Sequence, residues 1–343
     1  MPPGCRFCYH APVFERPPQI PEDYLELVIE VTPQYAGWRA DRFVAHRIPR
    51  LSRNRIQQIF KVRAFDGNGR PMKADQRMRT GECIVMYRSP PDEPVPDAEL
   101  VVLYEDEWFI AVDKPPGLPV HPTAKHHHHT VTWLLEERFG RENRPNLAHR
   151  IDAETSGVLL CTRDLDAERE MKKMFARRDV RKQYVAIVRG ILDPPSGRIE
   201  VPIAPNPHSI VKARMWCGDP QGMPALTEYE TIRVIGDCTF VRLKPRTGRQ
   251  HQLRVHLDHI GHTIVGDKLY GPDESLFLDY IHGGLTEDII RRAGHRRQAL
   301  HAARLEFRHP VTRQQVVIES PLPADMQALL AAGFSPAPDE RVQ

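Results

Sequence analysis

The sequence is poor in cysteine and has no long apolar run, and each shortage excludes a class of protein. Six cysteines in 343 residues do not make the disulfide framework of a small secreted domain, so we expect reduced thiols and a cytoplasmic protein. No run is long and apolar enough to span a membrane. The N-terminal stretch "MPPGCRFCYHAP" lacks a charged start followed by an apolar core, so we expect no signal peptide.

Complete metal-binding patterns are also missing. Cys5 and Cys8 form one C-x-x-C pair, but a structural zinc site needs four ligands and no second pair follows, even if His10 adds a third. The adjacent histidines His126–His129 cannot all face one ion well, so we interpret them as an exposed loop. The His-x-Glu and Pro-Cys-x-x-Cys signature of zinc deaminases is absent. We therefore expect no metal site.

The net charge is small but unevenly distributed. The chain carries +3 overall, whereas residues 35–88 contain 13 Lys or Arg and 4 Asp or Glu, a net of +9, so the remaining residues sum to −6. An excess of this kind also occurs on ordinary solvated faces. We favour contact with RNA or DNA because the excess of positive charge is concentrated in so short a segment of the chain.

The basic region has the pattern of a small folded module. "ADRFVAHRI" is helix-like, and a better helix starts after Ser52, whose hydroxyl is positioned to cap it. Arg53, Arg55 and Lys61 lie off the apolar stripe of that helix. With the later "RTGECIVM" these features resemble the S4-type RNA-binding domain, although "RAFDGNGRP" departs from its usual turn. We predict an N-terminal extension at 1–34, an S4-like α/β domain at 35–88 and a stiff Pro-rich linker at 89–99.

Beyond the linker, strand-like stretches dominate. Helical stretches intervene at roughly Thr130–Phe139, Leu165–Arg177 and Gln250–Ile260. The strands do not alternate regularly with helices, so a mixed, mostly antiparallel sheet is favoured over a doubly wound one. We predict an α+β fold in which residues 100–325 form one large domain with a central cleft, followed by a C-terminal tail at 326–343.

Polar side chains crowd the stretch "NLAHRIDAETSGVLLCT", just ahead of its apolar strand. Asp152 in that loop is by default a turn residue. Three further segments shift the balance towards a reactive group: "KPPGLPVHP", "RRDVRKQYVAIVRG" and "KPRTGRQHQLRVHLDHIGH". In the third, a Thr-Gly turn leads into a helix whose start is rich in Arg and amide side chains, which suit phosphate and carboxylate groups.

Together these segments resemble the RluA family of pseudouridine synthases. The family hallmark His-Arg-Leu-Asp-x-x-Thr-Ser-Gly corresponds to "HRIDAETSG", with Ile151 in place of leucine. "KPPGLPVHP", the Tyr184 strand, "TGRQHQLRVH", "VGDKLYG" and "LHAARLEFRHP" occur in the family's order, over roughly Leu100 to Pro323. An S4-type domain in front is common in this family. The resemblance implies an isomerase that converts uridine in RNA to pseudouridine and needs no cofactor and no metal.

The resemblance also implies roles for individual residues. Asp152 would be the catalytic aspartate, acting as nucleophile at C1′ or as base at the sugar, and Arg254 would be its cationic partner. Tyr184 would stack on the target base, and Arg150 would enter the space left by the flipped nucleotide. The further candidates near the substrate are His149, Thr155, Arg249 and His251. For His149, Thr155 and Ser156 a structural role in fixing the loop is the favoured interpretation.

Two other functions stay open at this point. A non-catalytic RNA-binding or ribosome-assembly protein could retain the fold, although Asp152, Tyr184 and Arg254 together weigh against it. A nucleoside hydrolase-like enzyme could use Asp152 to release a free base, although the basic region favours a polymer. The sequence does not choose between large-subunit rRNA and tRNA, nor does it name the uridine. We expect a monomer whose partner is RNA and which does not associate with a membrane.

Overall fold

The computed structural model describes residues 16–21, 24–49, 51–88, 99–122, 129–271 and 273–332. The chain forms two compact units, Met1–Glu93 and Pro94–Gln343, and each is described by itself. The predictions for Cys5, Cys8, His10 and residues 123–128, and for nearly all of the Pro-rich linker, fall outside the described residues.

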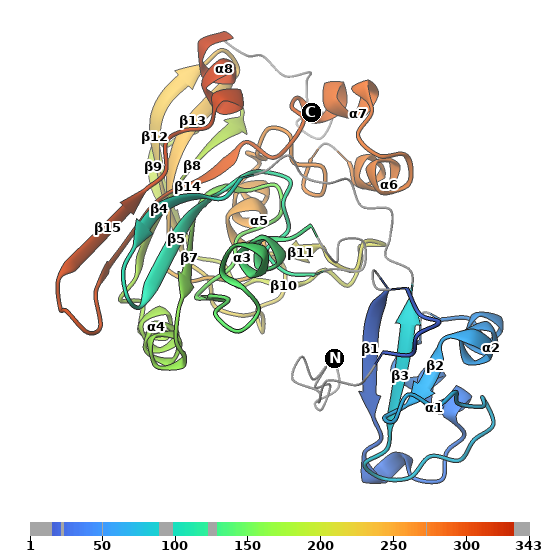
Figure 1. The fold of residues 1–343 in the computed structure, drawn as a ribbon. Coiled ribbons are helices and arrows are strands. Elements are labelled where there is room, and N and C mark those ends of the chain that lie inside the picture. Colours follow the sequence, from blue (N-terminus) through green and yellow to red (C-terminus); the bar gives the residue numbers. More distant parts are fainter. Residues whose placement is uncertain are drawn as a thin grey trace. The chain divides into compact units, whose positions relative to one another are not determined.

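The small unit is a three-stranded antiparallel sheet covered by two helices (Figure 1). Its elements are β1 (Leu25–Glu30), η1 (Pro33–Tyr35), α1 (Ala40–Arg47), α2 (Arg53–Val62), β2 (Ala64–Asp66) and β3 (Cys83–Arg88). The predicted start at residue 35 is too late, because β1 pairs with β3 along its whole length. Ile29 and Val31 are buried in the same core as Phe43 and Ile56, so this segment belongs to the unit and not to an extension.

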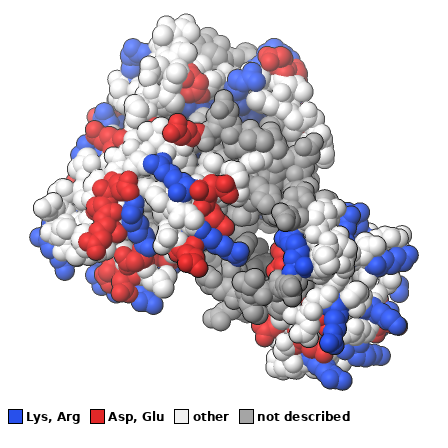
Figure 2. Space-filling view, viewed as in Figure 1, with Lys and Arg blue, Asp and Glu red and all other residues white. Residues whose placement is uncertain are grey.

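Helix α2 has the predicted cap and the predicted two faces. The Ser52 hydroxyl accepts a hydrogen bond from the backbone N–H of Arg55 at 3.3 Å. Ile56 and Phe60 are buried against the sheet, while Arg53, Arg55 and Lys61 are exposed. Figure 2 shows Lys and Arg side chains gathered on the visible face of this unit.

The large unit is built on one curved ten-stranded sheet (Figure 1). Among the described strands every pairing in it is antiparallel except β7 with β14, which confirms the predicted α+β class. The main path runs in the order β4 (Val101–Glu105), β5 (Phe109–Lys114), β7 (Ser156–Thr162), β14 (Leu300–Arg308), β8 (Arg181–Arg189), β13 (Cys238–Pro245), β12 (Thr227–Ile235) and β9 (Ser196–Ile199). Strands β6 (Asn146–Leu147) and β15 (Gln315–Glu319) pair with β7 and β14, and β10 (Ala204–Pro205) pairs with β11 (Met215–Trp216) in a separate hairpin.

The parallel contact between β7 and β14 depends on a glycine. Gly157 has a φ of +109°, and a Cβ at this position would lie 2.3 Å from the carbonyl oxygen of Ala302 on β14. A side chain would therefore force the two strands apart. This close approach fixes the strand that directly follows the Asp152 loop.

Among the described residues of the large unit, three of the six helices were predicted and three were not. Helices α3 (Val131–Phe139), α4 (Leu165–Arg177) and α5 (Gln252–His259) lie where the sequence placed them, whereas α6 (Glu274–Gly283), α7 (Glu287–Ala293) and α8 (Ala324–Ala332) are additional. Helix α8 crosses the predicted boundary at 325, because Met326, Leu329 and Leu330 pack into the main core at helical spacing. The large domain therefore extends at least to Ala332. No helix among the described residues is long and apolar enough to cross a membrane.

Candidate active site

A pocket of about 580 Å³ opens where four segments of the large unit meet. The segments are the loop before β7, the start of β8 with the turn that precedes it, the turn between β13 and α5, and the start of β14. All eight large-domain residues proposed from the sequence line this one pocket: His149, Arg150, Asp152, Thr155, Tyr184, Arg249, His251 and Arg254. The volume lies within the range of roughly 300 to 1,000 Å³ typical of ligand sites.

A buried lysine holds the backbone of the Asp152 loop by hydrogen bonds. Lys114 is fully buried, and its ammonium donates to the carbonyl oxygens of Pro115, Leu118 and Ala153 at 2.7, 2.9 and 2.7 Å. Because Ala153 directly follows Asp152, this lysine holds the backbone that carries the carboxylate. Burial, with Arg297 nearby, lowers the pKa of Lys114 to about 7.

Asp152 and Arg254 meet, as the sequence predicted. Nη1 of Arg254 donates to Oδ2 of Asp152 at 2.8 Å, and the Asp152 side chain is 30% exposed to the pocket. Burial on its own would raise the pKa of Asp152, but the Arg254 guanidinium outweighs it and holds the pKa below its ordinary value. The pocket therefore contains an ionised carboxylate that is partly open to a ligand.

A third member of this group, Asp267, was missed. The other edge of the Arg254 guanidinium forms a two-pronged ion pair with Asp267, with Nε and Nη2 donating at 2.6 and 2.9 Å. Asp267 is buried and also accepts hydrogen bonds from the backbone N–H groups of Leu269 and Tyr270. Burial opposes its ionisation, but Arg254 and these donors lower its pKa. The signal in the sequence is a lone acid inside the otherwise largely apolar "VGDKLYG" motif.

His251 enters helix α5 through a strained conformation. Its φ of +54° lies in the left-handed region, which is uncommon for a residue with a side chain. Its Nδ1 lies 3.1 Å from the hydroxyl of Tyr270. Burial and the adjacent Arg254 lower the pKa of His251 to about 4, so the ring is neutral at pH 7.

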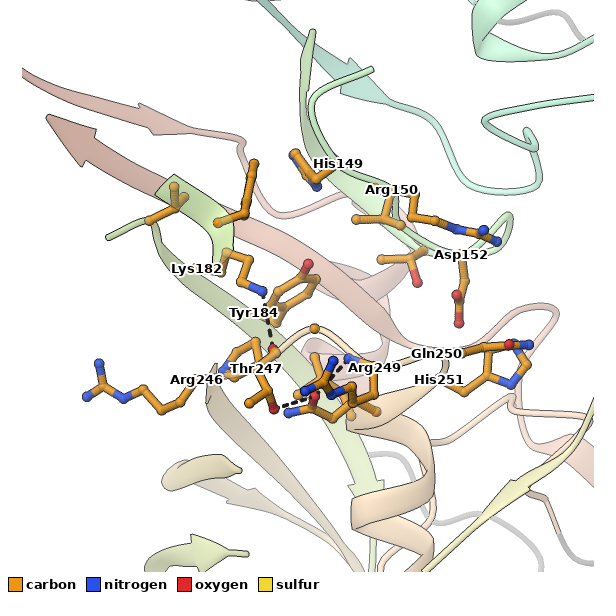
Figure 3. Close-up of a pocket in the computed structure, with 18 of the residues that line it drawn as sticks. His149, Arg150, Asp152, Lys182, Tyr184, Arg246, Thr247, Arg249, Gln250 and His251 are labelled. Atoms are coloured by element: carbon orange, nitrogen blue, oxygen red, sulfur yellow. Dashed lines mark hydrogen bonds between the residues drawn. The ribbon is translucent and has the colours of Figure 1, made fainter. Parts of the chain in front are cut away.

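Tyr184 and Arg150 occupy different parts of the pocket. In Figure 3, Tyr184 is seen between Lys182 and the carboxylate of Asp152, while the Arg150 side chain extends from its loop past Asp152. Burial and the Asp152 charge raise the pKa of Tyr184, so its hydroxyl stays protonated at neutral pH. Arg150 is exposed. The aromatic ring therefore borders the space beside the carboxylate, and an exposed cation lies at the edge of the pocket.

His149 and Thr155 line the pocket, but their polar atoms bind the protein. Nε2 of His149 accepts a hydrogen bond from the backbone N–H of Leu160 at 3.1 Å, and burial lowers its pKa to about 3. The Thr155 hydroxyl accepts from the side-chain amide of Gln298 at 2.6 Å. Arg249 donates from Nε to the carbonyl of Pro224 at 3.1 Å. The contacts of His149 and Thr155 agree with the structural role favoured from the sequence.

Lys182 is a second pocket residue that sequence reasoning missed. It lies two residues before Tyr184 on β8, and alternate residues of a strand share a face. The sequence could therefore have placed Lys182 beside Tyr184. Its ammonium lies 3.3 Å from the carbonyl oxygen of Thr247 (Figure 3), and burial lowers its pKa to about 8. Within the described residues no group of three or more His, Cys, Asp or Glu side chains could hold a metal ion.

The family model for RNA pseudouridylate synthase matches residues 108–259. That range includes Asp152, Tyr184 and Arg254, and relatives more than 30% identical align over most of the chain. The chain belongs to the RNA pseudouridylate synthase family, and it is an isomerase that converts uridine in RNA to pseudouridine.

Particular relatives extend the match beyond the pocket. The chain is 32% identical over 317 residues to ribosomal large subunit pseudouridine synthase D of Zymomonas mobilis, which covers 88% of this chain and 95% of the relative. The same-named protein of Xylella fastidiosa is 36% identical over 304 residues, covering 87% and 89%. The solved structure of human RNA Pseudouridylate Synthase Domain Containing 1 aligns with a TM-score of 0.52 at 26% identity, covering 72% of this chain and 100% of the human chain.

Proposed function

We propose that this enzyme isomerises specific uridines in large-subunit ribosomal RNA, with Asp152 as the reacting carboxylate. One observation supports this assignment above the others. Asp152 is held by Arg254, which is itself fixed by the buried Asp267, so an ionised carboxylate faces a nucleotide-sized pocket in a defined position. The names of the Zymomonas and Xylella relatives support the large ribosomal subunit over tRNA.

The proposed reaction needs no external reactant. The N1–C1′ bond of the uridine breaks, the base rotates, and C5 bonds to C1′; the proton lost from C5 is balanced by the proton gained at N1. Asp152 acts at the sugar, either by bonding to C1′ or by removing a proton there, and both routes begin with an ionised carboxylate. The Arg254 contact supplies that state by keeping the pKa of Asp152 low.

Access to the base requires it to leave its stack. We propose that Tyr184 stacks on the extruded uracil, because its ring borders the space beside Asp152 (Figure 3). We propose that the exposed Arg150 takes the space vacated in the RNA. Arg249 and His251 lie at the start of α5 on the opposite wall and contact the substrate from there.

We further propose that residues 24–88 are an S4-type RNA-binding module. Support comes from the cap and exposed basic face of α2, where Arg53, Arg55 and Lys61 project away from the core. These side chains would contact RNA phosphates and raise affinity without taking part in the bond changes.

The direct test is to map pseudouridines in ribosomal RNA and tRNA from a strain that lacks the gene. The proposal expects sites in large-subunit rRNA to disappear, and to return with the wild-type gene but not with Asp152→Asn. Loss confined to tRNA would contradict the substrate assignment. Release of free uracil by the purified enzyme would contradict the reaction and favour glycosidic hydrolysis.

We also propose that the enzyme acts as a monomer in the cytoplasm and without metal. Among the described cysteines, Cys161, Cys217 and Cys238 are free thiols, which suits a reducing compartment. The fraction of monomer mass should convert uridine to pseudouridine, and this activity should survive prolonged treatment with EDTA. Activity restored only by added metal, or confined to a dimer fraction, would contradict these points.

A further inference from the structure

A second cavity adjoins the catalytic pocket. It measures about 450 Å³ and shares five lining residues with the pocket: Arg178, Val180, Lys182, Pro245 and Arg246. Its walls come from the turn between α4 and β8, the start of β8, the end of β13 with the residue after it, and β14. The two cavities are therefore one continuous depression. We call the second part the cationic groove.

The groove is strongly positive. Six cationic residues and a single acid, Glu306, line it; the cations are Arg178, Arg181, Lys182, Lys244, Arg246 and Arg304. Glu306 is already shared by Arg181 and Arg304, at 3.3 and 3.4 Å. Arg246 pairs with Glu228 outside the groove at 2.7 Å. The single acid cannot neutralise the remaining cations.

Arg178 and Lys244 are two of the groove's cations that remain available for a ligand. Neither side chain forms an ion pair or a side-chain hydrogen bond with another described residue, although Lys244 lies opposite Glu228 on β12 and its charge helps to lower the pKa of that carboxylate. Both are exposed. Cations so close together repel one another, and a bound polyanion relieves that repulsion while releasing its counterions.

Lys182 and Arg246 mark the junction of the two cavities. The Lys182 ammonium lies within hydrogen-bond distance of the Thr247 carbonyl oxygen. An ammonium has three N–H donors, so the others can face a ligand. Figure 3 shows Arg246 pointing away from the Asp152 end of the pocket. The cationic side chains of the groove thus extend from the catalytic pocket on one side only, away from Asp152.

We propose that the cationic groove binds phosphates of the RNA strand adjacent to the target uridine, with Arg178 and Lys244 as the phosphate-contacting residues. The inference rests on the proposed function, because the groove continues the pocket in which Asp152 acts. It assigns one direction for the strand as it leaves the catalytic pocket. The contacts position the RNA and are independent of base identity.

The variant for the test is Arg178→Gln/Lys244→Gln, which removes two charges and keeps a polar side chain at each position. The chain offers a matched control in Arg177→Gln/Lys212→Gln, because Arg177 and Lys212 are exposed and line neither cavity. RNA affinity is measured in the full chain with Asp152→Asn, so that no turnover occurs. Two lost phosphate contacts predict a slope of log affinity against log salt that is shallower by about 1.4 for single-stranded RNA. The control pair should keep the wild-type slope.

Synthetic RNAs with one neutral methylphosphonate at each successive linkage then locate the contact. The parent protein should lose affinity at one or two linkages on one side of the target. The groove variant should show no further loss at those linkages, while the control should lose affinity like the parent. Two results would overturn the groove as a phosphate site. One is that the affinity losses from the methylphosphonate and from the groove variant add at every linkage, and the other is that the salt slope is unchanged.

Failure of the groove and failure of the proposed function give different results. The first case is an enzyme with Asp152 restored that forms pseudouridine, although the affinity losses from the groove variant and from the methylphosphonate add at every linkage. This result refutes only the groove as a phosphate site. A protein that binds RNA with the predicted non-additivity but forms no pseudouridine refutes the proposed function alone. A chain that binds no RNA contradicts both. Thermal melting of each variant confirms that it is folded.

Discussion

Arg254 and Asp267 form a two-pronged ion pair inside the protein, and the same guanidinium reaches Asp152 with its remaining edge. The guanidinium has a rigid fork of donors, so fixing two of them on Asp267 also fixes the direction of the third. The position of Asp152 in the pocket therefore depends on a residue that never faces the pocket.

Replacement of Arg254 should disturb Asp152 most directly. Arg254→Leu leaves both carboxylates without a cation, so the pKa of Asp152 should rise and the acidic limb of the pH–rate profile should move upward. Arg254→Lys should rescue activity poorly, because an ammonium cannot make the planar contacts. Activity of each variant is measured across pH. An acidic limb that stays in place, with activity retained, would mean that the pair does not control Asp152.

Asp267→Asn should reduce activity although Asp267 touches no substrate. Breaking one side of a buried ion pair destabilises by about 3 to 5 kcal/mol, and it also leaves Arg254 free to turn. Asp106→Asn is a matched control, because Asp106 likewise accepts backbone hydrogen bonds from residues two and three positions ahead. Asp106 lines neither cavity.

Both variants are compared by urea unfolding and by turnover at saturating RNA. The expected result is a stability loss in both and a loss of turnover only in Asp267→Asn. Equal turnover in the two variants would reduce Asp267 to a purely structural residue.

The stability of the large unit should fall in mild acid because buried neutral histidines must protonate on unfolding. His256 is buried, contacts Thr227 and the carbonyl of Val201, and has a pKa lowered by burial to about 4. Between pH 4 and 6.5 the unfolded chain therefore binds more protons than the folded chain. The resulting stability is complete above pH 6.5 and is lost as pH falls through 4.

Urea unfolding of His256→Gln at pH 5 and pH 7 tests this dependence. The variant should show a smaller difference in unfolding free energy between the two pH values than the wild type. His208→Gln, at an exposed position, serves as control and should keep the wild-type difference. The same difference in all three proteins would remove His256 from the explanation.

The pocket was largely readable from the sequence because its residues lie in short contiguous motifs. Helix α4 occupies the predicted Leu165–Arg177, and the eight proposed residues meet in one cavity. Asp267 was not identified because its significance depends on Arg254, thirteen positions earlier, which only the folded chain brings to it. Lys114 was not identified because the Ala153 carbonyl oxygen that it contacts lies 39 positions later in the chain and is brought to it by the sheet.

The domain limits were less readable, for a different physical reason. Strand β1 has no local partner, since β3 lies more than fifty residues later, so its membership of the small unit appears only through pairing. Helices α6 and α7 bury Leu276, Ile289 and Ala293 against each other rather than in a main core. Such a separate cluster gives a weak periodic signal in each short helix.

Removal of the small unit should weaken RNA binding without abolishing chemistry. A chain starting at Glu99 retains the complete ten-stranded sheet and the pocket. It should bind structured RNA more weakly and with a shallower salt slope, while keeping turnover on a short saturating oligonucleotide. Both chains are compared across a salt series. A folded truncated protein with no turnover would show that the small unit completes the active site.

The charge reversal Arg53→Glu/Arg55→Glu/Lys61→Glu tests the same assignment in the full chain. Because these side chains are exposed on α2, the helix should stay folded while RNA affinity falls. Affinity equal to the wild type would mean that this face contacts solvent or another protein.

Asp152→Asn provides the most direct test of the central claim. Asparagine keeps the shape of the side chain and can still accept a hydrogen bond from Arg254, but it carries no negative charge and is a poor nucleophile and base. The measurement is pseudouridine formed per enzyme molecule by the purified variant, with RNA affinity determined on the same preparation. The account predicts no detectable pseudouridine and an affinity within a few-fold of the wild type. Turnover near the wild-type rate would contradict it.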